Sequence, residues 1–212
     1  MIKLAAFLGN PGSKYAQNRH NAGRMVAQAL PYYRSLSWQK KYNGLYAIYE
    51  GIHFIQPENY MNRSGIAVQA AASFFKIKLE EIIVVHDELE LPLGTISLKF
   101  SGGLGGHNGL RSMKESFGSA DFWRLRIGLG RPDSRLPGEG GQAGSGEGIV
   151  DWVLSDFSKA EQETLYPALD ASANLLQQTF VCEPETLLDE WKKKKTIIPK
   201  KLESSENMEE QQ

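Results

Sequence analysis

The stretch IKLAAFLGNPG, residues 2–12, predicts the first strand of the fold and the turn that ends it. Its first seven residues are almost all apolar, which is typical of a buried strand. The next four residues, Gly9–Gly12, are of types that favour turns. We therefore expect a buried strand that leads directly into a polar loop.

Strand and helix patterns alternate along the rest of the chain. Strands are expected over residues 81–89, 94–100 and 122–130, and a hairpin that turns at Gly51 over residues 45–57. Helices are expected over residues 21–33, with Asn21 as the cap, and over 62–77, 108–118 and 158–180. This order predicts an α/β fold: a single domain with a twisted, mixed and largely parallel central sheet and helices on both faces. Ligands bind at the carboxyl ends of the strands in such sheets.

The chain is expected to form one domain over residues 1–185, followed by a tail. Residues 137–148, PGEGGQAGSGEG, are a glycine-rich insertion that cannot bury enough surface to order itself. Residues 186–212 are expected to form a helical and charged tail that is partly disordered.

Composition excludes several classes of protein. The 212 residues carry a net charge of -1, whereas a protein that coats nucleic acid would be far more basic. The sequence has no apolar run near the ~20 residues of a membrane span, and its start does not resemble a secretory signal. The single cysteine, Cys182, cannot form an internal disulfide and fits a reducing cytoplasm.

The stretch SGGLGGHNGL, residues 101–110, raises the possibility of a nucleotide site. The dinucleotide fingerprint needs three glycines at fixed spacing after a first strand. Counting from Gly103, the sixth residue is Asn108, and GNPGSKY after the first strand has neither that spacing nor that of a P-loop. A nucleotide-binding oxidoreductase is therefore disfavoured. His107 and Asn108 are expected to open the following helix.

The histidines leave a metal site open as an alternative. His53 falls in an alternating strand and is interpreted as a packing or surface residue. A metal-assisted esterase could use His86, Asp87 and His107, although the chain has no H-E-x-x-H motif and no cysteine pair. His86 and Asp87 point to opposite faces of their strand, so that only one of them can face a shared site. Sensitivity to EDTA would separate this alternative from metal-free hydrolysis.

Polar side chains gather where the predicted elements end. They are Asn10, His20, Asn62, Asp87, His107 and Asn108. Without a serine elbow or a usable cysteine, this set favours hydrolysis by an activated water molecule. An imidazole with an ordinary pKa of ~6.5 is the natural base near neutral pH. A carboxylate can orient that imidazole, and amide groups can donate to an oxyanion.

The sequence resembles the bacterial peptidyl-tRNA hydrolase family. The resemblance is carried by five blocks: FLGNPGSKYAQNRHNAG (7–23), PENYMNRSG (57–65), VVHDELELPLG (84–94), GGLGGHNGL (102–110) and FWRLRIGLGRP (122–132). It covers about residues 1–185 and makes that span the catalytic domain. It implies hydrolysis of the ester bond between a peptide, or an N-blocked amino acid, and tRNA, which recycles tRNA lost from stalled translation.

The resemblance also assigns roles to individual residues. It implies that His20 is the base, that Asp87 orients and charges it, and that Asn10 lies near the scissile ester. It implies that the substrate is bound by Tyr15, Met61, Asn62, His107 and Asn108. Lys99 and Arg126, which we call the basic pair, would hold the tRNA 5′-phosphate. No metal and no organic cofactor is implied, and the partner would be peptidyl-tRNA alone, bound by a cytoplasmic monomer.

The sequence departs from the family pattern in places. Ser97 stands where the family often has a second basic residue, so that the basic pair would be weaker or helped by Arg111 or Lys114. Leu104 occupies a position that is frequently polar, and the 137–148 insertion is longer than usual. An RNA-binding relative without catalysis is a further alternative, but such a relative would be expected to lack His20 or Asp87.

Overall fold

The computed structural model describes residues 1–132, 146–192 and 195–197. Its strands are β1 (Leu4–Phe7), β2 (Gln39–Lys41), β3 (Gly44–Tyr49), β4 (Ile52–Pro57), β5 (Ile82–Glu88), β6 (Thr95–Phe100), β7 (Trp123–Gly128) and β8 (Lys195–Thr196). Its α-helices are α1 (Ala22–Gln28), α2 (Ser64–Phe75), α3 (Asn108–Phe117), α4 (Gly146–Leu154), α5 (Lys159–Val181) and α6 (Leu188–Trp191). Three short 3-10 helices also carry candidate site residues: η1 (Ser13–Tyr15), η2 (Arg19–Asn21) and η4 (Met61–Arg63).

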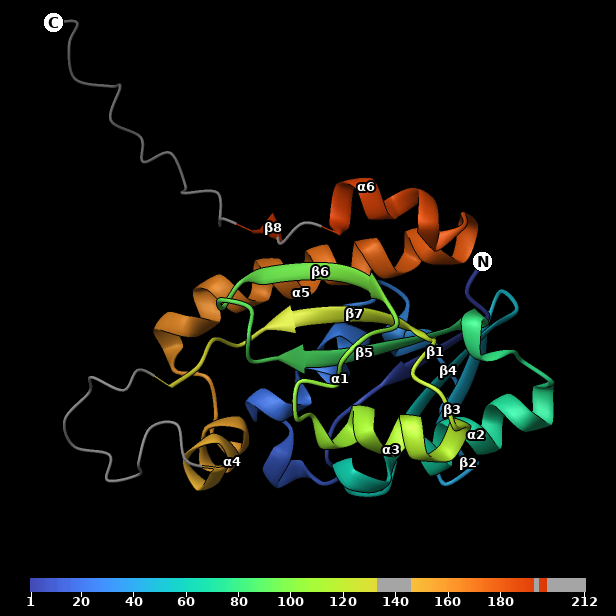
Figure 1. Ribbon diagram of the computed structural model, residues 1–212, viewed down its shortest axis with the longest axis horizontal. Helices are drawn as coiled ribbons and strands as arrows, with labels where there is room; N and C mark the ends of the chain where they lie inside the picture. The colour runs from blue at the N-terminus through green and yellow to red at the C-terminus, as the bar shows by residue number, and fades with distance from the viewer. Residues whose placement is uncertain (133–145, 193–194, 198–212) are drawn as a thin grey trace, which may run out of the picture.

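All eight strands form one mixed sheet in the order β2-β3-β4-β1-β5-β7-β6-β8. The four central strands β4, β1, β5 and β7 are mutually parallel, whereas β2, β3, β6 and β8 pair antiparallel at the two sides. The predicted fold class is confirmed, and so is the predicted hairpin, which is β3–β4. Figure 1 shows α5 along one side of the sheet and α2 and α3 along the other.

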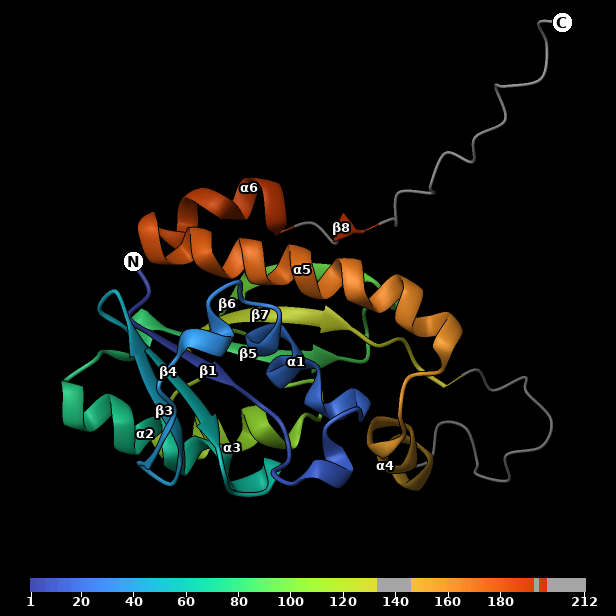
Figure 2. The same ribbon diagram turned by 180° about the vertical axis from the view of Figure 1, so that it is seen from behind.

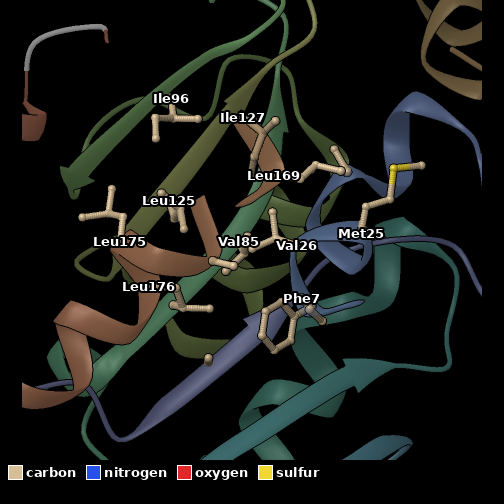
Figure 3. Close-up of a cluster of buried hydrophobic side chains, with 14 of the residues drawn as sticks. Phe7, Met25, Val26, Val85, Ile96, Leu125, Ile127, Leu169, Leu175 and Leu176 are labelled. Atoms are coloured by element: carbon tan, nitrogen blue, oxygen red, sulfur yellow. The ribbon is translucent and has the colours of Figure 1, made fainter. Parts of the chain in front are cut away.

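Alternate residues of the central strands divide the core into two layers. Ala5 and Phe7 of β1 face the layer that α1 and α5 cover, whereas Leu4 and Ala6 face the layer under α2 and α3. Both layers are fully buried at these positions, which explains why β1 reads as a continuous apolar run. Figure 3 shows the first layer, in which Val26 of α1 lies with Phe7 and with side chains of β5, β7 and α5.

Two helices differ from the predicted boundaries. Helix α1 ends at Gln28, earlier than expected, and Pro31 follows three residues later, where a helix cannot continue normally. Helix α4 was not predicted, because glycine dominates the sequence around its start. Most of the predicted insertion, residues 137–145, lies outside the described residues, and Gly146–Gly148 opens α4.

The segment after α5 folds back onto the sheet. Trp191 of α6 is buried in the core layer of α1 and α5, and β8 pairs antiparallel with β6. Figure 2 shows α6 beside α5 and β8 near the edge of the sheet. The boundary at residue 185 stays a prediction. No helix within the described ranges combines the length and the apolar character that crossing a bilayer requires.

Candidate active site

The carboxyl ends of the parallel strands bring the predicted site residues to one edge of the sheet. Asn10 lies just beyond β1, Asp87 is the next-to-last residue of β5, and Met61 follows shortly after β4. Because β4, β1 and β5 are adjacent and parallel, these three positions lie side by side. The site expected from the sequence is thus assembled by strand order.

His20 and Asp87 meet directly. The Nδ1 atom of His20 lies 3.0 Å from Oδ1 and 3.0 Å from Oδ2 of Asp87. The close approach of α1 to the sheet permits this contact: a Cβ atom on Gly23 would lie 2.4 Å from the carbonyl oxygen of Val85. Glycine at position 23 therefore lets the chain that carries His20 lie against the end of β5.

The surroundings shift the pKa values of both groups toward an ion pair. Burial is the largest influence on the pKa of His20 and opposes its charge, but the Asp87 carboxylate and its hydrogen bond outweigh burial and raise that pKa. Burial likewise opposes charge on Asp87, yet the fields of His20 and His107 and their hydrogen bonds hold the pKa of this carboxyl well below its usual range. Asp87 is therefore an anion at neutral pH.

His107 makes a second contact with the same carboxylate. It is the N-cap of α3, and its Nδ1 atom accepts hydrogen bonds from the backbone N–H of Gly109 at 3.0 Å and of Leu110 at 3.3 Å. An accepting Nδ1 leaves the proton of the neutral ring on Nε2. That Nε2 lies 3.0 Å from Oδ1 of Asp87 and so donates to it. His107 opens the helix as predicted, and it also contacts the carboxylate, whereas its substrate-binding role stays a prediction.

Among the described residues, His20, Asp87 and His107 also have the proximity of metal ligands, with ligand atoms within 4.8 Å of one another. A metal-bound histidine usually donates its other ring N–H to a carboxylate, a carbonyl or water. The Nδ1 atom of His107 instead accepts two backbone N–H groups, so a metal at Nε2 would compete with the proton that this tautomer places there. The hydrogen bonds favour a carboxylate held between two imidazoles over a metal centre.

His86 lies apart from the contact between His20 and Asp87. Its ring is buried, and its Nδ1 atom donates to the carbonyl oxygen of Asp87 at 2.7 Å. Burial above all, and then the field of His107, lowers the pKa of His86 well below its ordinary value and keeps the ring neutral. Of the adjacent pair His86 and Asp87, it is Asp87 that meets His20, in keeping with the alternation of a strand.

Asn10 makes three hydrogen bonds, two with Asn21 and one with Met61. Its backbone N–H donates to Oδ1 of Asn21 at 2.8 Å, and its carbonyl oxygen accepts from Nδ2 of Asn21 at 3.0 Å. Its own Oδ1 accepts from the backbone N–H of Met61 at 2.9 Å. The fixed Oδ1 leaves the Nδ2 group of Asn10 as the donor that can face a substrate.

The other predicted substrate-binding residues differ in exposure. Met61 is buried, and its sulfur packs so close to the start of α3 that a Cβ atom on Gly109 would lie 2.6 Å away. Asn62 and Asn108 are exposed, and the Oδ1 atom of Asn108 accepts from Arg111 at 3.3 Å. Tyr15 is half-buried in η1, between Asn10 and His20 in the chain. The roles assigned to these residues stay predictions.

Residues 101–106, which we call the glycine loop, are tied to the sheet by Arg124. The side chain of Arg124 donates to the carbonyl oxygens of Gly103 at 2.6 Å and Gly102 at 2.9 Å. Gly102 has a φ of +102°, and a Cβ atom there would lie 2.7 Å from the Nζ atom of Lys99. The loop therefore favours glycine at this position for its backbone conformation, whereas the flexible end of Lys99 could move aside.

The basic pair lies on the same face of β6 and β7. Lys99 stands opposite Arg124, and Ser97 stands opposite Arg126 in the antiparallel register. The Nη2 atom of Arg126 donates to Ser97 Oγ at 2.8 Å, and its Nη1 atom lies 3.7 Å from a carboxylate oxygen of Glu88. Ser97, which replaces a basic residue of the family pattern, thus orients Arg126.

Strand register separates Lys99 from the carboxylate of Asp87. Lys99 is opposite Arg124, which is opposite Val84 on β5. Val84 precedes Asp87 by three residues, about 10 Å along the strand at roughly 3.3 Å per residue. Arg126, in contrast, is opposite His86, the residue before Asp87, so only Lys99 is displaced along the sheet from this carboxylate.

Sequence reasoning missed three residues that organise the site. Asn21 was expected to cap α1, but its side chain makes no cap hydrogen bond and holds Asn10 instead. Arg124, which anchors the glycine loop, was not singled out because a strand arginine reads as a surface charge. Arg19 is buried beside His20, and its pairing with distant residues had no local signal.

Comparison with known proteins identifies relatives of this chain. The sequence model of the peptidyl-tRNA hydrolase family matches residues 4–198. A curated peptidyl-tRNA hydrolase from Treponema pallidum (strain Nichols) is 43% identical over 206 residues, which cover 92% of this chain and 97% of that protein. The crystal structure of peptidyl-tRNA hydrolase from Acinetobacter baumannii superposes with a TM-score of 0.73 at 35% identity, over 90% of this chain and 95% of that one. The chain belongs to the peptidyl-tRNA hydrolase family.

Proposed function

We propose that the protein hydrolyses the ester bond between a peptide, or an N-blocked amino acid, and tRNA by means of a water molecule that His20 activates. The observation that carries this proposal is the contact of His20 Nδ1 with both carboxylate oxygens of Asp87 at 3.0 Å. Such hydrolysis recycles tRNA from stalled translation. We place the enzyme in the cytoplasm, as a monomer.

The tautomer of His20 determines how protons move in the reaction. Nδ1 of His20 donates to Asp87, which leaves the lone pair of Nε2 to accept a proton from water. The water oxygen bonds to the ester carbon, and the ionised Asp87 stabilises the imidazolium. When the tetrahedral intermediate collapses, the C–O bond to the ribose breaks and His20 returns its proton to the ribose oxygen. The carboxylic acid product loses its own proton to solvent.

Amide groups complete the site. The Nδ2 group of Asn10 donates to the oxyanion, since its Oδ1 is engaged by Met61. Asn62 and Asn108, both exposed, bind the peptide, while Met61 and Tyr15 contact the peptide and the terminal nucleotide. His107 donates to the same Asp87 oxygen that His20 contacts and so helps to hold this carboxylate. These steps require neither a metal nor an organic cofactor.

A comparison of two substrates tests the proposed substrate class. N-acetyl-aminoacyl-tRNA is expected to be cleaved far faster than free aminoacyl-tRNA, because a peptide-reading site binds an acylated amine and excludes a charged one. Ester release from the two tRNAs at equal concentration is the measurement. Equal rates on both would show an esterase that does not recognise a peptide, and no release from either would contradict the proposed function.

We further propose that the basic pair binds the tRNA 5′-phosphate. Reversal of both charges, Lys99→Glu with Arg126→Glu, is expected to raise KM for peptidyl-tRNA by about 10-fold or more, because two charge-assisted phosphate contacts become repulsive. The KM for a short N-blocked aminoacyl-nucleotide, which lacks the 5′ end, is expected to change by less than about twofold on the same physical ground.

The matched control for this change reverses Lys159 and Arg34, which are exposed elsewhere on the protein. This control alters net charge equally and is expected to leave both KM values unchanged. A similar rise of KM for the long and the short substrates would mean that the basic pair does not read the tRNA end.

A further inference from the structure

The residue before the proposed base, Arg19, is unusually enclosed for a cation. Its side chain is only 4% exposed, and its guanidinium lies 3.8 Å from the ring centre of Trp152 and 5.0 Å from that of Phe157. Long charged side chains are almost never this buried unless they are paired. A role in solubility therefore does not explain why this charged side chain is buried.

The partners of this guanidinium all belong to the segment that ends α4 and begins α5. Nη2 donates to both carboxylate oxygens of Glu161, at 2.7 and 2.8 Å. Nη1 donates to Ser155 Oγ at 2.7 Å and to the carbonyl oxygen of Asp156. A planar guanidinium held bidentately and covered by rings has one orientation only. We call Arg19 with Ser155, Asp156 and Glu161 the arginine clamp.

The chain just before His20 is tied to the same segment. The N–H of Arg19 donates to the carbonyl oxygen of Ser155 at 3.0 Å. Nδ2 of Asn18 donates to Oδ1 of Asp156 at 2.6 Å, and these two residues form an isolated antiparallel bridge. The chain just before His20 is thus fixed by residues more than 130 positions away in the sequence, since Arg19 and Ser155 are 136 residues apart.

Glu161 links this arrangement to a rigid element. It forms a capping box with Ser158 at the start of the 23-residue helix α5, and its Oε2 accepts from the N–H of Ser158 at 2.8 Å. Helix α5 in turn packs Leu165 and Leu169 into the main core layer. The carboxylate that holds Arg19 is therefore itself held by a helix end.

We propose that the arginine clamp is a positioning device that sets the location of His20 relative to Asp87, so that the α4–α5 junction contributes to catalysis without touching the substrate. This inference rests on the proposed function of His20. Misplacement of a catalytic group by 1 Å can cost about 100-fold in rate. The clamp is expected to act on kcat, because it orders the base and makes no contact with the tRNA.

Two variants test the proposal. Glu161→Gln keeps a residue that can complete the capping box but removes the ion pair, and Arg19→Lys keeps the charge but removes the planar, bidentate contact. Each is expected to lower kcat by about 10-fold or more through misplacement of His20 while KM for N-acetyl-aminoacyl-tRNA stays within about twofold. Glu163→Gln, an exposed position two residues along α5, is the matched control and is expected to match the wild type.

A readout independent of substrate separates positioning from mere stability. The proton shared by His20 Nδ1 and Asp87 is expected to give a downfield NMR resonance in the wild type, and this resonance is expected to shift or broaden in both variants. If Arg19→Lys does not fold, Glu161→Gln decides. Folded variants with lower melting temperatures but unchanged kcat and resonance would overturn the proposal. An inactive wild type with an intact resonance would contradict only the proposed function.

Discussion

Replacing His20 with alanine is expected to lower kcat for N-acetyl-aminoacyl-tRNA by about 10³-fold or more, since general-base catalysis contributes roughly 10²–10⁴-fold and the variant leaves no imidazole beside Asp87 to accept a proton from water. The KM is expected to change little, because His20 acts on water rather than on the tRNA. Single-turnover measurement of ester release isolates this chemical step from product release.

The fold is expected to survive this substitution. The buried ring of His20 contacts Asp87 and His107, whereas β1 and β5 pack through apolar side chains, so its removal is expected to leave that apolar packing intact. His53→Ala is the control, because this histidine packs against Phe75 and pairs with Leu4 near the amino end of β4, whereas the candidate site lies at the carboxyl ends of the strands. A His20→Ala protein that melts like the wild type and retains near-normal kcat would exclude His20 as the base.

Replacing Asp87 with asparagine is expected to lower kcat by about 10²–10⁴-fold, because an amide can donate to Nδ1 of His20 and hold the wrong tautomer. The sign of the accompanying pH effect is fixed. The Asp87 carboxylate raises the pKa of His20 and burial lowers it. Loss of the carboxylate leaves burial unopposed, so the acid limb of the rate profile moves to lower pH while the plateau falls.

The control for this change is Asp170→Asn, an exposed carboxylate on α5, which is expected to leave kcat and the pH profile unchanged. His107 also donates to Asp87, through its Nε2 atom, so the substitution removes the carboxylate from both histidines. An Asp87→Asn protein with wild-type kcat and an unmoved acid limb would show that this carboxylate neither orients nor charges His20.

The fold was largely predictable because its central strands are apolar on both faces. The run IIVV at the start of β5 is apolar throughout and so predicts a buried strand. The polar residues after it indicate the carboxyl end of that strand. Helix α4 was not predictable, because glycine at its start obscures the helical pattern. The pairing of β8 with β6 was missed because a two-residue strand in a charged segment has no periodicity.

The meeting of His20 and Asp87 was predicted, but the residues that hold them were not. Arg19 and Glu161 are 142 residues apart, and each alone reads as a surface charge. The tautomer of His107 depends on the two backbone N–H groups at the start of α3, which only the folded chain brings to its Nδ1 atom. Long-range pairing and hydrogen-bond direction are properties of the assembled site.

The central claim is that a histidine held by a buried carboxylate is the group whose ionisation controls the rate. The most direct measurement is NMR titration of His20 alongside the pH dependence of kcat/KM, which reports ionisation in the free enzyme. Both measurements are expected to give the same pKa, above the ordinary value of about 6.5, and both values are expected to fall together in Asp87→Asn. A rate profile whose acid limb does not follow the titration of His20 would contradict the account.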